Sequence, residues 1–227
     1  MSCVLVRNLF HTLKNQKVLV TAGPTREHWD PVRFHSNAAS GRMGTALANE
    51  AARLGARVVL ILGPAAGNAP RPHKQVRVIP VTGALEMDRQ VRKHLPGTKV
   101  FIGAAAVSDY RPAAVSRQKI KDQPATVMLK LVRNPDIIAN VARARPGRPL
   151  LVIGFALETQ DLMKNAAMKL KRKDLDWVVA NRETNLGTSK GSVTLLSRWY
   201  ERISLGPMTK ERLAGRIWKA VLERPAL

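Results

Sequence analysis

Short apolar runs alternate with helix-like segments along this chain, and that alternation limits the folds that it can adopt. The first run, residues 17–22, ends at a Gly-Pro pair, and a similar run over residues 57–62 also ends at one. Continuous apolar strands are typical of strands covered on both faces, and their alternation with helices favours a mostly parallel sheet. We therefore expect an α/β fold with helices on both faces of the sheet.

The patterns also place the expected elements. Strands are expected at residues 17–22, 57–62, 76–81, 99–107, 150–156, 177–180 and 193–196, and helices at residues 44–54, 84–94, 161–173 and 210–222.

Residues 111–133 interrupt this alternation. They contain a polar loop and then a segment, residues 125–132, in which apolar and polar residues alternate as in an exposed or interfacial strand. We expect a small β excursion here that pairs with another subunit. The chain as a whole is expected to divide into an N-terminal extension, residues 1–15, and a single domain, residues 16–227.

The chain is strongly basic, with 38 Lys and Arg against 16 Asp and Glu and a net charge of +22. A surface of this charge attracts polyanions, which include nucleic acids, membrane phosphates and nucleotides. Aromatic residues make up only 4% of the chain, so stacking platforms for single-stranded nucleic acid are scarce. We expect nucleic acid to bind only through non-specific charge.

Other patterns exclude further classes of protein. No apolar run is long enough to span a membrane, and the N-terminal segment lacks the continuous apolar core of a signal peptide. Cys3 is the single cysteine, which excludes an internal disulfide framework and a multi-cysteine metal site. We expect a cytoplasmic protein without a membrane partner.

Candidate ligand-binding segments flank the first expected helix. Gly23 would let backbone N–H groups approach an anion, but Pro24 breaks the usual dinucleotide fingerprint. Further along, Ser40, Gly41 and Arg42 combine small residues with a cation at the start of the helix, a pattern suited to a phosphate. The alternative is that Ser40 only caps the helix.

Two further polar residues are candidates for ligand contacts. Asn37 carries an amide that can both donate and accept hydrogen bonds, although it could equally be a turn residue. Three alanines after Gly103 make a flat surface for a ring, and Asp109 follows them, where open parallel sheets bind ligands. Asp109 could accept hydrogen bonds from a nucleobase, hold a metal, or only cap a turn.

Two pairs of lysines are also candidates. Lys119 and Lys121 point the same way in an extended segment, so both can meet one anion, or they form a basic edge that discourages aggregation. Lys169 and Lys173 share one helix face and can reach the same phosphate chain, or they form a solvated basic face. Because no nucleophile–base pair is present, we expect phosphoryl or nucleotidyl transfer, in which positioning and charge neutralisation supply most of the catalysis.

Ordered motifs over roughly residues 16–222 resemble those of a known enzyme family. The motifs are KVLVTAGPTRE, DPVRFHSNAASGRMG, GAAAVSDYRP, KIK, RNPDII, GFALET, KLKRKDLDWVVAN and SVTLL. In this order they resemble phosphopantothenate–cysteine ligase, which in many bacteria is the C-terminal half of a bifunctional coenzyme A biosynthesis protein. The resemblance implies a Rossmann-like form of the α/β fold expected above.

The resemblance also implies a reaction. The carboxylate of 4′-phosphopantothenate would attack the α-phosphate of CTP, with Mg²⁺, and L-cysteine would then displace CMP from the acyl-cytidylate. Alternatives are an ATP-dependent form of the same ligase and a catalytically impaired homologue that binds nucleic acid. The family forms homodimers, and a stand-alone ligase would pass its product to a separate phosphopantothenoylcysteine decarboxylase.

Roles for individual residues follow from the resemblance. Asn37 would bind the acyl-nucleotidylate and assist its turnover, and Lys119 would lie in a mobile flap and neutralise developing charge. Ser40, Gly41 and Arg42 would take the substrate phosphate. The residues that would contact the nucleotide are Gly103, Ala104, Ala105, Asp109, Lys119, Pro135, Asp136, Ile137, Ile138, Phe155, Lys169 and Lys173.

Four features depart from the family pattern. Arg182 stands where the family usually has Asp, Asp122 replaces a third flap lysine, and Ala39 replaces a common Ser. The stretch 183–191 is short. Since Asn37 is retained, as are the other motif residues, we expect an active enzyme.

Overall fold

A computed structural model describes residues 13–64, 70–121, 125–185 and 187–223 of the chain. Residues 1–12 of the expected N-terminal extension, which include Cys3, lie outside the described residues, and so does Asp122. No helix in the described part is both long enough and apolar enough to cross a membrane.

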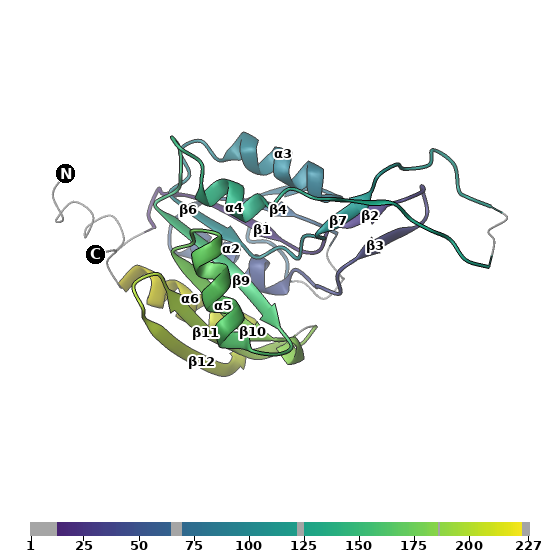
Figure 1. Cartoon of the computed structure of the whole chain (residues 1–227). Helices are drawn as coiled ribbons and strands as arrows, with labels where there is room; N and C mark the ends of the chain where they lie inside the picture. Colours follow the sequence, from purple (N-terminus) through teal and green to yellow (C-terminus); the bar gives the residue numbers. More distant parts are fainter. Residues whose placement is uncertain (1–12, 65–69, 122–124, 186, 224–227) are drawn as a thin grey trace.

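The core of the fold is an eight-stranded sheet with the strand order β12-β11-β10-β9-β6-β1-β4-β5 (Figure 1). The strands from β10 to β5 in this order run parallel, and β11 and β12 add an antiparallel edge. Their bounds are β1 (Lys17–Ala22), β4 (Arg57–Leu62), β5 (Val76–Pro80), β6 (Val100–Gly103), β9 (Leu151–Glu158), β10 (Trp177–Arg182), β11 (Lys190–Ser197) and β12 (Arg202–Thr209).

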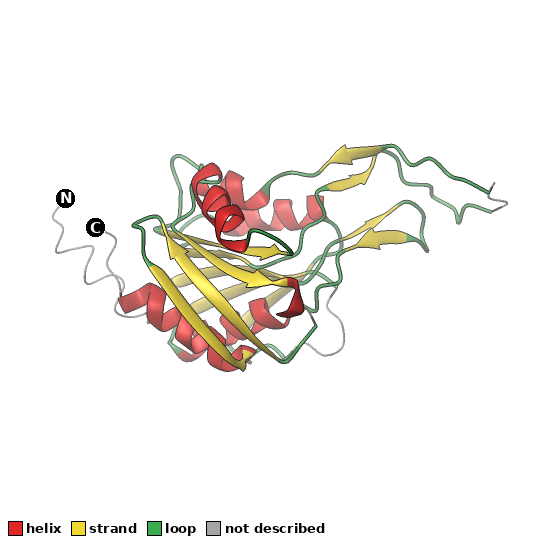
Figure 2. Cartoon of the chain, turned by 60° about the horizontal axis from the view of Figure 1, so that its bottom comes forward, coloured by secondary structure: helices red, strands yellow, loops and turns green. Residues whose placement is uncertain are grey.

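Helices cover both faces of this sheet, which confirms the expected α/β class (Figure 2). One face packs against α2 and α6 around residues such as Leu47 and Trp218. The other packs against α3, α4 and α5 around residues such as Met87 and Ile137. The helices are α2 (Arg42–Arg53), α3 (Ala84–His94), α4 (Ile137–Ala142), α5 (Leu162–Arg172) and α6 (Lys210–Glu223), with a short 3-10 helix η1 (Glu183–Asn185) after β10.

The chain reverses its winding direction between β1 and β6. From β1 the chain passes through α2 to β4 and β5 on one side, and it returns to build β6, β9 and β10 on the other. Loops diverge at such a point, and open α/β sheets bind ligands there, outside the carboxyl ends of the strands. The loops after β1 and β4 are packed tightly, because a Cβ on Gly63 would lie 1.9 Å from the carbonyl oxygen of Pro24.

Two antiparallel ribbons leave the body and form an arm, defined here as residues 26–36, 110–121 and 125–133 (Figures 1 and 2). The first ribbon pairs β2 (Arg26–His28) with β3 (Phe34–Ser36), and the second pairs β7 (Tyr110–Pro112) with β8 (Leu131–Arg133). The expected excursion from the sheet is therefore present. Its short strands were not expected, because segments of three residues carry little periodicity.

Two expected strands are much longer than the strands in the structure, whereas the strands expected at residues 177–180 and 193–196 are shorter than β10 and β11. Of residues 125–132, only Leu131 onward forms a strand. Residues 125–130 are exposed and belong to no strand ladder, although the Lys130 carbonyl oxygen accepts a hydrogen bond from the Ala113 N–H. The strand expected at residues 99–107 ends at Gly103. Beyond Gly103 the chain leaves β9, and Ala106 meets Pro24 in a single bridge, so the three alanines lie in a loop rather than on a strand.

Helix α6 is locked onto α2 by a buried tryptophan. The indole Nε1–H of Trp218 donates to the carbonyl oxygen of Leu47 at 2.9 Å, and both side chains are fully buried. Large buried aromatic side chains contribute much of a core's packing energy. This contact therefore joins the C-terminal helix to the helix that follows the central strand.

Truncation of Trp218 tests how far the fold depends on that contact. We expect Trp218→Phe to lower the free energy of unfolding by about 1–2 kcal/mol, through the lost hydrogen bond and a small void. Trp218→Ala should cost about 3–5 kcal/mol, because it leaves a large cavity. Urea unfolding followed by circular dichroism measures both, with exposed Lys219→Ala as the control. Equal stability of Trp218→Ala and wild type would contradict the assignment.

Candidate functional site

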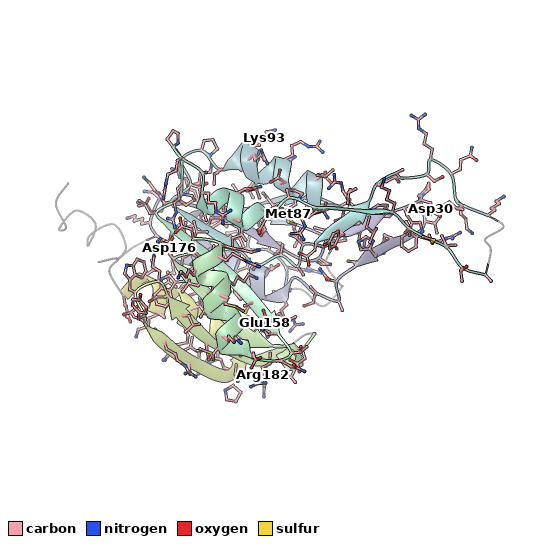
Figure 3. All side chains as sticks on the ribbon, in the orientation of Figure 1. Asp30, Met87, Lys93, Glu158, Asp176 and Arg182 are labelled. Atoms are coloured by element: carbon pink, nitrogen blue, oxygen red, sulfur yellow. The ribbon has the colours of Figure 1, made fainter. Side chains whose placement is uncertain are left out.

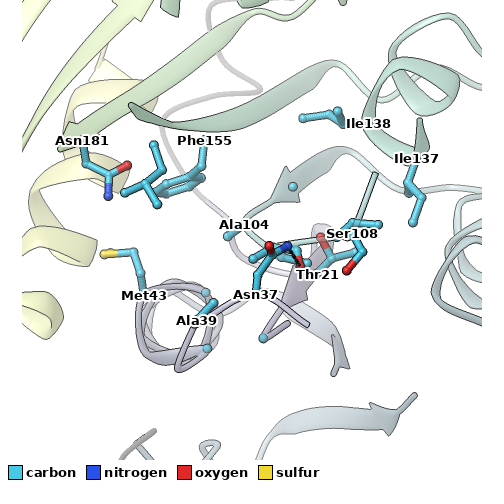
Figure 4. A pocket seen from close by; sticks show the side chains of 18 of the residues that line it. Thr21, Asn37, Ala39, Met43, Ala104, Ser108, Ile137, Ile138, Phe155 and Asn181 are labelled. Atoms are coloured by element: carbon cyan, nitrogen blue, oxygen red, sulfur yellow. Dashed lines mark hydrogen bonds between the residues drawn. The ribbon is translucent and has the colours of Figure 1, made fainter. Parts of the chain in front are cut away.

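A cavity of about 570 Å³ opens at the carboxyl ends of the central strands (Figure 4). It is lined by the ends of β1 and β6, the start of α2, the segment before α4, and side chains from β9, β10 and α5. Every candidate residue from the sequence except Lys119 and Lys121 lines this one cavity. The structure therefore gathers segments that are far apart in the chain.

The start of α2 forms the floor of the cavity. The backbone N–H of Arg42 donates to the Ser40 hydroxyl at 3.4 Å, and Gly41, with φ of 75°, provides the turn into the helix. A Cβ on Gly44 would lie 2.5 Å from the Cβ of Ala22, so the glycine lets α2 press against β1. The N-cap of α2 is therefore Gly41, and the simpler interpretation of Ser40 as only a helix cap is wrong. Ser40 lies one residue earlier and lines the cavity.

Asn37 is anchored by one end of its amide. Its Nδ2 donates to the carbonyl oxygen of Ala106 at 3.0 Å, and the Ala106 N–H in turn donates to Gly23 O at 2.9 Å. Among the residues that the structure describes, no donor contacts Asn37 Oδ1. The anchored amide therefore presents an oxygen that can accept a hydrogen bond from a ligand (Figure 4).

An apolar wall faces the floor. A Cβ on Gly103 would lie 2.8 Å from Ile138 Cδ1, so Ile138 packs directly over this glycine. Phe155 and Ala104 also line the cavity, but they pack with the α2 and α6 face of the sheet, whereas Ile138 packs with the other face (Figure 4). Apolar surfaces can accept the face of an aromatic ring, and the three alanines after Gly103 line this cavity, so the contact with a ring expected there stays a prediction.

The two lysines of α5 enter the cavity from the side, and each already has an oxygen partner. Lys173 Nζ forms an ion pair with Asp136 at 2.9 Å, and Lys169 Nζ donates to the carbonyl oxygen of Phe155. Asp136 also accepts from the N–H of Ala139 and so caps α4. The alternative of a freely solvated basic face is therefore wrong for both lysines.

Burial changes the acidity of Lys169. Desolvation, followed by the charge of Lys173, lowers the pKa of Lys169 to about 8, against the opposing effect of carboxylates that include Glu158. A lysine with this pKa is partly neutral at slightly alkaline pH. A phosphate ligand would favour its charged form.

The cavity is rich in basic groups. Five basic and two acidic side chains line it, namely Arg42, Arg133, Lys169, Lys173, Lys210, Asp109 and Asp136. Such an excess of positive charge favours an anionic ligand. Within the described residues, no cluster of three His, Cys, Asp or Glu side chains could hold a metal ion by itself.

Asn181 and Lys210 are two of the lining residues that were not selected from the sequence. Asn181 is the penultimate residue of the parallel strand β10, near the carboxyl end where ligand contacts concentrate, so its position in the sequence contained a usable signal. Lys210 begins α6, far along the chain, and no local pattern indicates that it reaches the cavity. Among the family departures, Ala39 lines the cavity, whereas Arg182 is exposed and lies outside it (Figure 3).

Lys119 lies on the arm, outside the cavity lining. The next residue, Ile120, is held at both of its backbone polar groups. Its N–H donates to the buried carboxylate of Asp30 at 3.3 Å, and its carbonyl oxygen accepts from Arg33. Burial opposes the charge on Asp30, but hydrogen bonds from backbone N–H groups outweigh it and lower the pKa of this carboxyl group. Asp30 thus ties the two parts of the arm together (Figure 3).

Comparisons with known proteins identify the family of this chain. Residues 13–224 match the family described as the DNA/pantothenate metabolism flavoprotein C-terminal domain. The bifunctional coenzyme A biosynthesis protein CoaBC of Vibrio cholerae is 43% identical over 219 residues, which are 93% of this chain and 53% of that protein. CoaBC of Escherichia coli is 40% identical over 210 residues, 90% of this chain and 51% of that protein. The chain thus spans about half the length of these relatives.

A solved structure also matches over nearly its whole length. The crystal structure of the C-terminal domain of the bifunctional protein CoaBC has a TM-score of 0.78 to this chain and is 36% identical. The match covers 93% of this chain and 96% of the other. The overall fold therefore belongs to a known architecture.

The acidity of Lys169 can be measured directly. We expect NMR titration of the lysine side chains to give Lys169 a pKa of about 8. Lys173→Met should raise it, because removal of a neighbouring positive charge favours the protonated amine. Lys171→Met, an exposed change on the same helix, is the control and should leave the pKa of Lys169 unchanged. An unchanged value in Lys173→Met would show that the two amines do not interact.

Proposed function

Because the chain belongs to the DNA/pantothenate metabolism flavoprotein C-terminal domain family, we propose that it is a ligase that joins 4′-phosphopantothenate to L-cysteine. CTP is the energy source in this proposal. One observation carries it: a single basic cavity collects all but one of the residues that the family motifs assign to substrates. Both phosphorylated substrates are anionic, and the cavity has the charge to take them.

The proposed reaction has two steps. A carboxylate oxygen of 4′-phosphopantothenate attacks the α-phosphorus of CTP, the bond to the β-phosphate breaks, and pyrophosphate leaves. The cysteine amine then attacks the acyl carbon, loses a proton, and displaces CMP. Charge neutralisation and exclusion of water favour such steps, and cations that converge on one cavity provide the first of these.

The apolar wall and the α5 lysines form the proposed nucleotide subsite. The cytosine ring lies against Gly103, Ala104 and Ala105, and its phosphates reach Lys169 and Lys173. A triphosphate competes with Asp136 for Lys173, so nucleotide binding replaces an ion pair within the chain by one with the ligand. Ile138 and Phe155 close the apolar side.

Magnesium fits this site as a partner of the nucleotide. Mg²⁺ keeps several waters and usually takes only one or two carboxylates together with phosphate oxygens. Asp109 and Asp136 line the cavity and supply such carboxylates. When bound, the ion neutralises charge on the triphosphate.

Two residues have catalytic roles in the proposal. The Asn37 amide, anchored on Ala106, binds the acyl-cytidylate and assists its turnover. Lys119 neutralises charge in the first step, which requires the arm to bring it to a cavity that it does not line in this structure. Ser40, Gly41 and Arg42 receive a substrate phosphate at the start of α2.

We further propose that the arm pairs with a second copy of this chain. Large apolar side chains are exposed along it, and Met128 is 99% exposed at its outer part. Exposed apolar groups gathered on a projecting segment are typical of an interface. The others are Val32, Phe34, Tyr110, Val115, Ile120, Val127, Leu129 and Leu131.

A pyrophosphate-release assay with 4′-phosphopantothenate and cysteine tests the function. We expect release with CTP and little with ATP, GTP or UTP. Asn37→Asp should form acyl-cytidylate but turn it over about 10²-fold more slowly, because a carboxylate replaces the amide beside an anionic intermediate. Lys119→Gln should slow the first half-reaction by a similar factor.

The two variants control for each other, since Asn37→Asp should accumulate the acyl-cytidylate, whereas Lys119→Gln should form it slowly and not accumulate it. Equal release with all four nucleotides would contradict the assignment of CTP. A wild-type protein that releases no pyrophosphate, but binds RNA tightly at physiological salt, would instead support a nucleic-acid-binding homologue.

The proposed pairing through the arm can be tested by the molar mass of the protein in solution. We expect the wild-type chain to be a dimer by size-exclusion chromatography with light scattering. Val127→Asp combined with Leu129→Asp should give a monomer, because two charges would be buried without partners at the interface. Leu85→Asp, at an exposed apolar residue of α3, is the matched control and should remain a dimer. A dimer that survives the double change would place the interface elsewhere.

A further inference from the structure

Lys210 is a buried cation that the proposed mechanism does not use. It is the first residue of α6, it is 6% exposed, and it lines the cavity. Among the lysines and arginines that the structure describes, no other is buried to this extent. Lys210 already interacts with other groups of the protein, and an ammonium group carries three N–H donors, so it can also donate to a ligand in the cavity that it lines.

Arg42 makes this position still less favourable for a charge. Burial and then the charge of Arg42 lower the pKa of Lys210, so the two cations lie within electrostatic reach of each other. Both also line the same cavity. Two cations that converge in a cavity repel each other, and an anion placed between them removes that repulsion.

The fold holds Lys210 in place from several sides. Its backbone N–H donates to Ser189 O at 3.0 Å, and the Thr209 hydroxyl caps the helix by accepting from Arg212 N at 3.3 Å. Further along α6, Trp218 fixes the helix to α2, which begins at Arg42. The two cations therefore start two helices that are locked together, and their relative position is set before any ligand binds.

We propose that Lys210, together with Arg42, binds a phosphate group of one of the two substrates on the α2–α6 side of the cavity. This inference rests on the proposed function and adds to it a residue from the C-terminal helix. The shared chemistry is a phosphate, which both CTP and 4′-phosphopantothenate carry. The α5 lysines lie toward α4 and β9, so this is a second phosphate site in the same cavity.

Calorimetric titration of a matched pair of variants tests the proposal. The probes are 4′-phosphopantothenate and, separately, CTP with Mg²⁺ but without the other substrates. Lys210→Met should raise the Kd of one probe by about 10- to 100-fold, as expected for the loss of a charge-assisted contact. The probe that weakens identifies which phosphate Lys210 holds.

Lys219→Met is the control, because it removes the same charge from an exposed position on the same helix. It should leave both dissociation constants within about twofold of wild type. Unchanged affinity for both probes in Lys210→Met would overturn the proposal. Equal weakening by Lys210→Met and Lys219→Met would also overturn it, because the effect would then be one of general charge.

A second measurement uses the wild-type chain, so that the result does not depend on how the variant folds. Acetic anhydride labels lysine amines, and peptide mass spectrometry reads the extent at Lys210 and Lys219. One probe should protect Lys210 and leave the labelling of Lys219 unchanged; equal labelling of Lys210 with and without both probes contradicts the proposal. Pyrophosphate release by the wild-type chain distinguishes a failure of this inference from a failure of the proposed function. If release occurs but Lys210 is neither required nor protected, only this inference is wrong, whereas absent release contradicts the proposed function itself.

Discussion

The close approach of α2 to the central strand is the contact on which the site depends. Gly44 has no side chain, and a Cβ there would lie 2.5 Å from Ala22 and 3.3 Å from Ala104. This glycine lets the start of α2 reach both sides of the switch point in the sheet. Because α6 docks on α2 through Trp218, the same contact also sets the position of the C-terminal helix. Because Gly44 has no side chain, α2 can form the floor of the cavity, and α6, which packs on α2, is positioned by the same contact.

Charge in this chain has two distinct roles. Basic side chains in the cavity are held at defined positions, and two of them, Lys169 and Lys210, have lowered pKa values because burial disfavours their charge. They are arranged before an anion arrives, which reduces the reorganisation that binding requires. The remainder of the +22 net charge lies outside the cavity, and the proposed ligase chemistry does not require it.

Local patterns were sufficient where burial is regular. The strands at residues 17–22 and 57–62 and the helix at residues 84–94 agree with the structure at both ends, because apolar runs and helical spacing record which faces are buried. Patterns failed at the arm and at the end of β6. Residues 125–130 alternate like a strand but have no partner strand among the described residues, and Ala104 continues an apolar run after the ladder has ended.

For this protein, the amino-acid sequence by itself determined the α/β class, the order of its central elements and most of the residues of the candidate site. Those features are local, because each is contained in a short stretch of the chain, such as a glycine at the end of a strand or the segment near Ser40 at the start of a helix. Only the tertiary structure decided that Lys210 shares a cavity with Arg42 and that Lys119 lies outside it. These placements depend on how α6 packs on α2 and on how Asp30 holds the arm. Such contacts join residues that are distant in the sequence, so they leave no periodic pattern in the sequence.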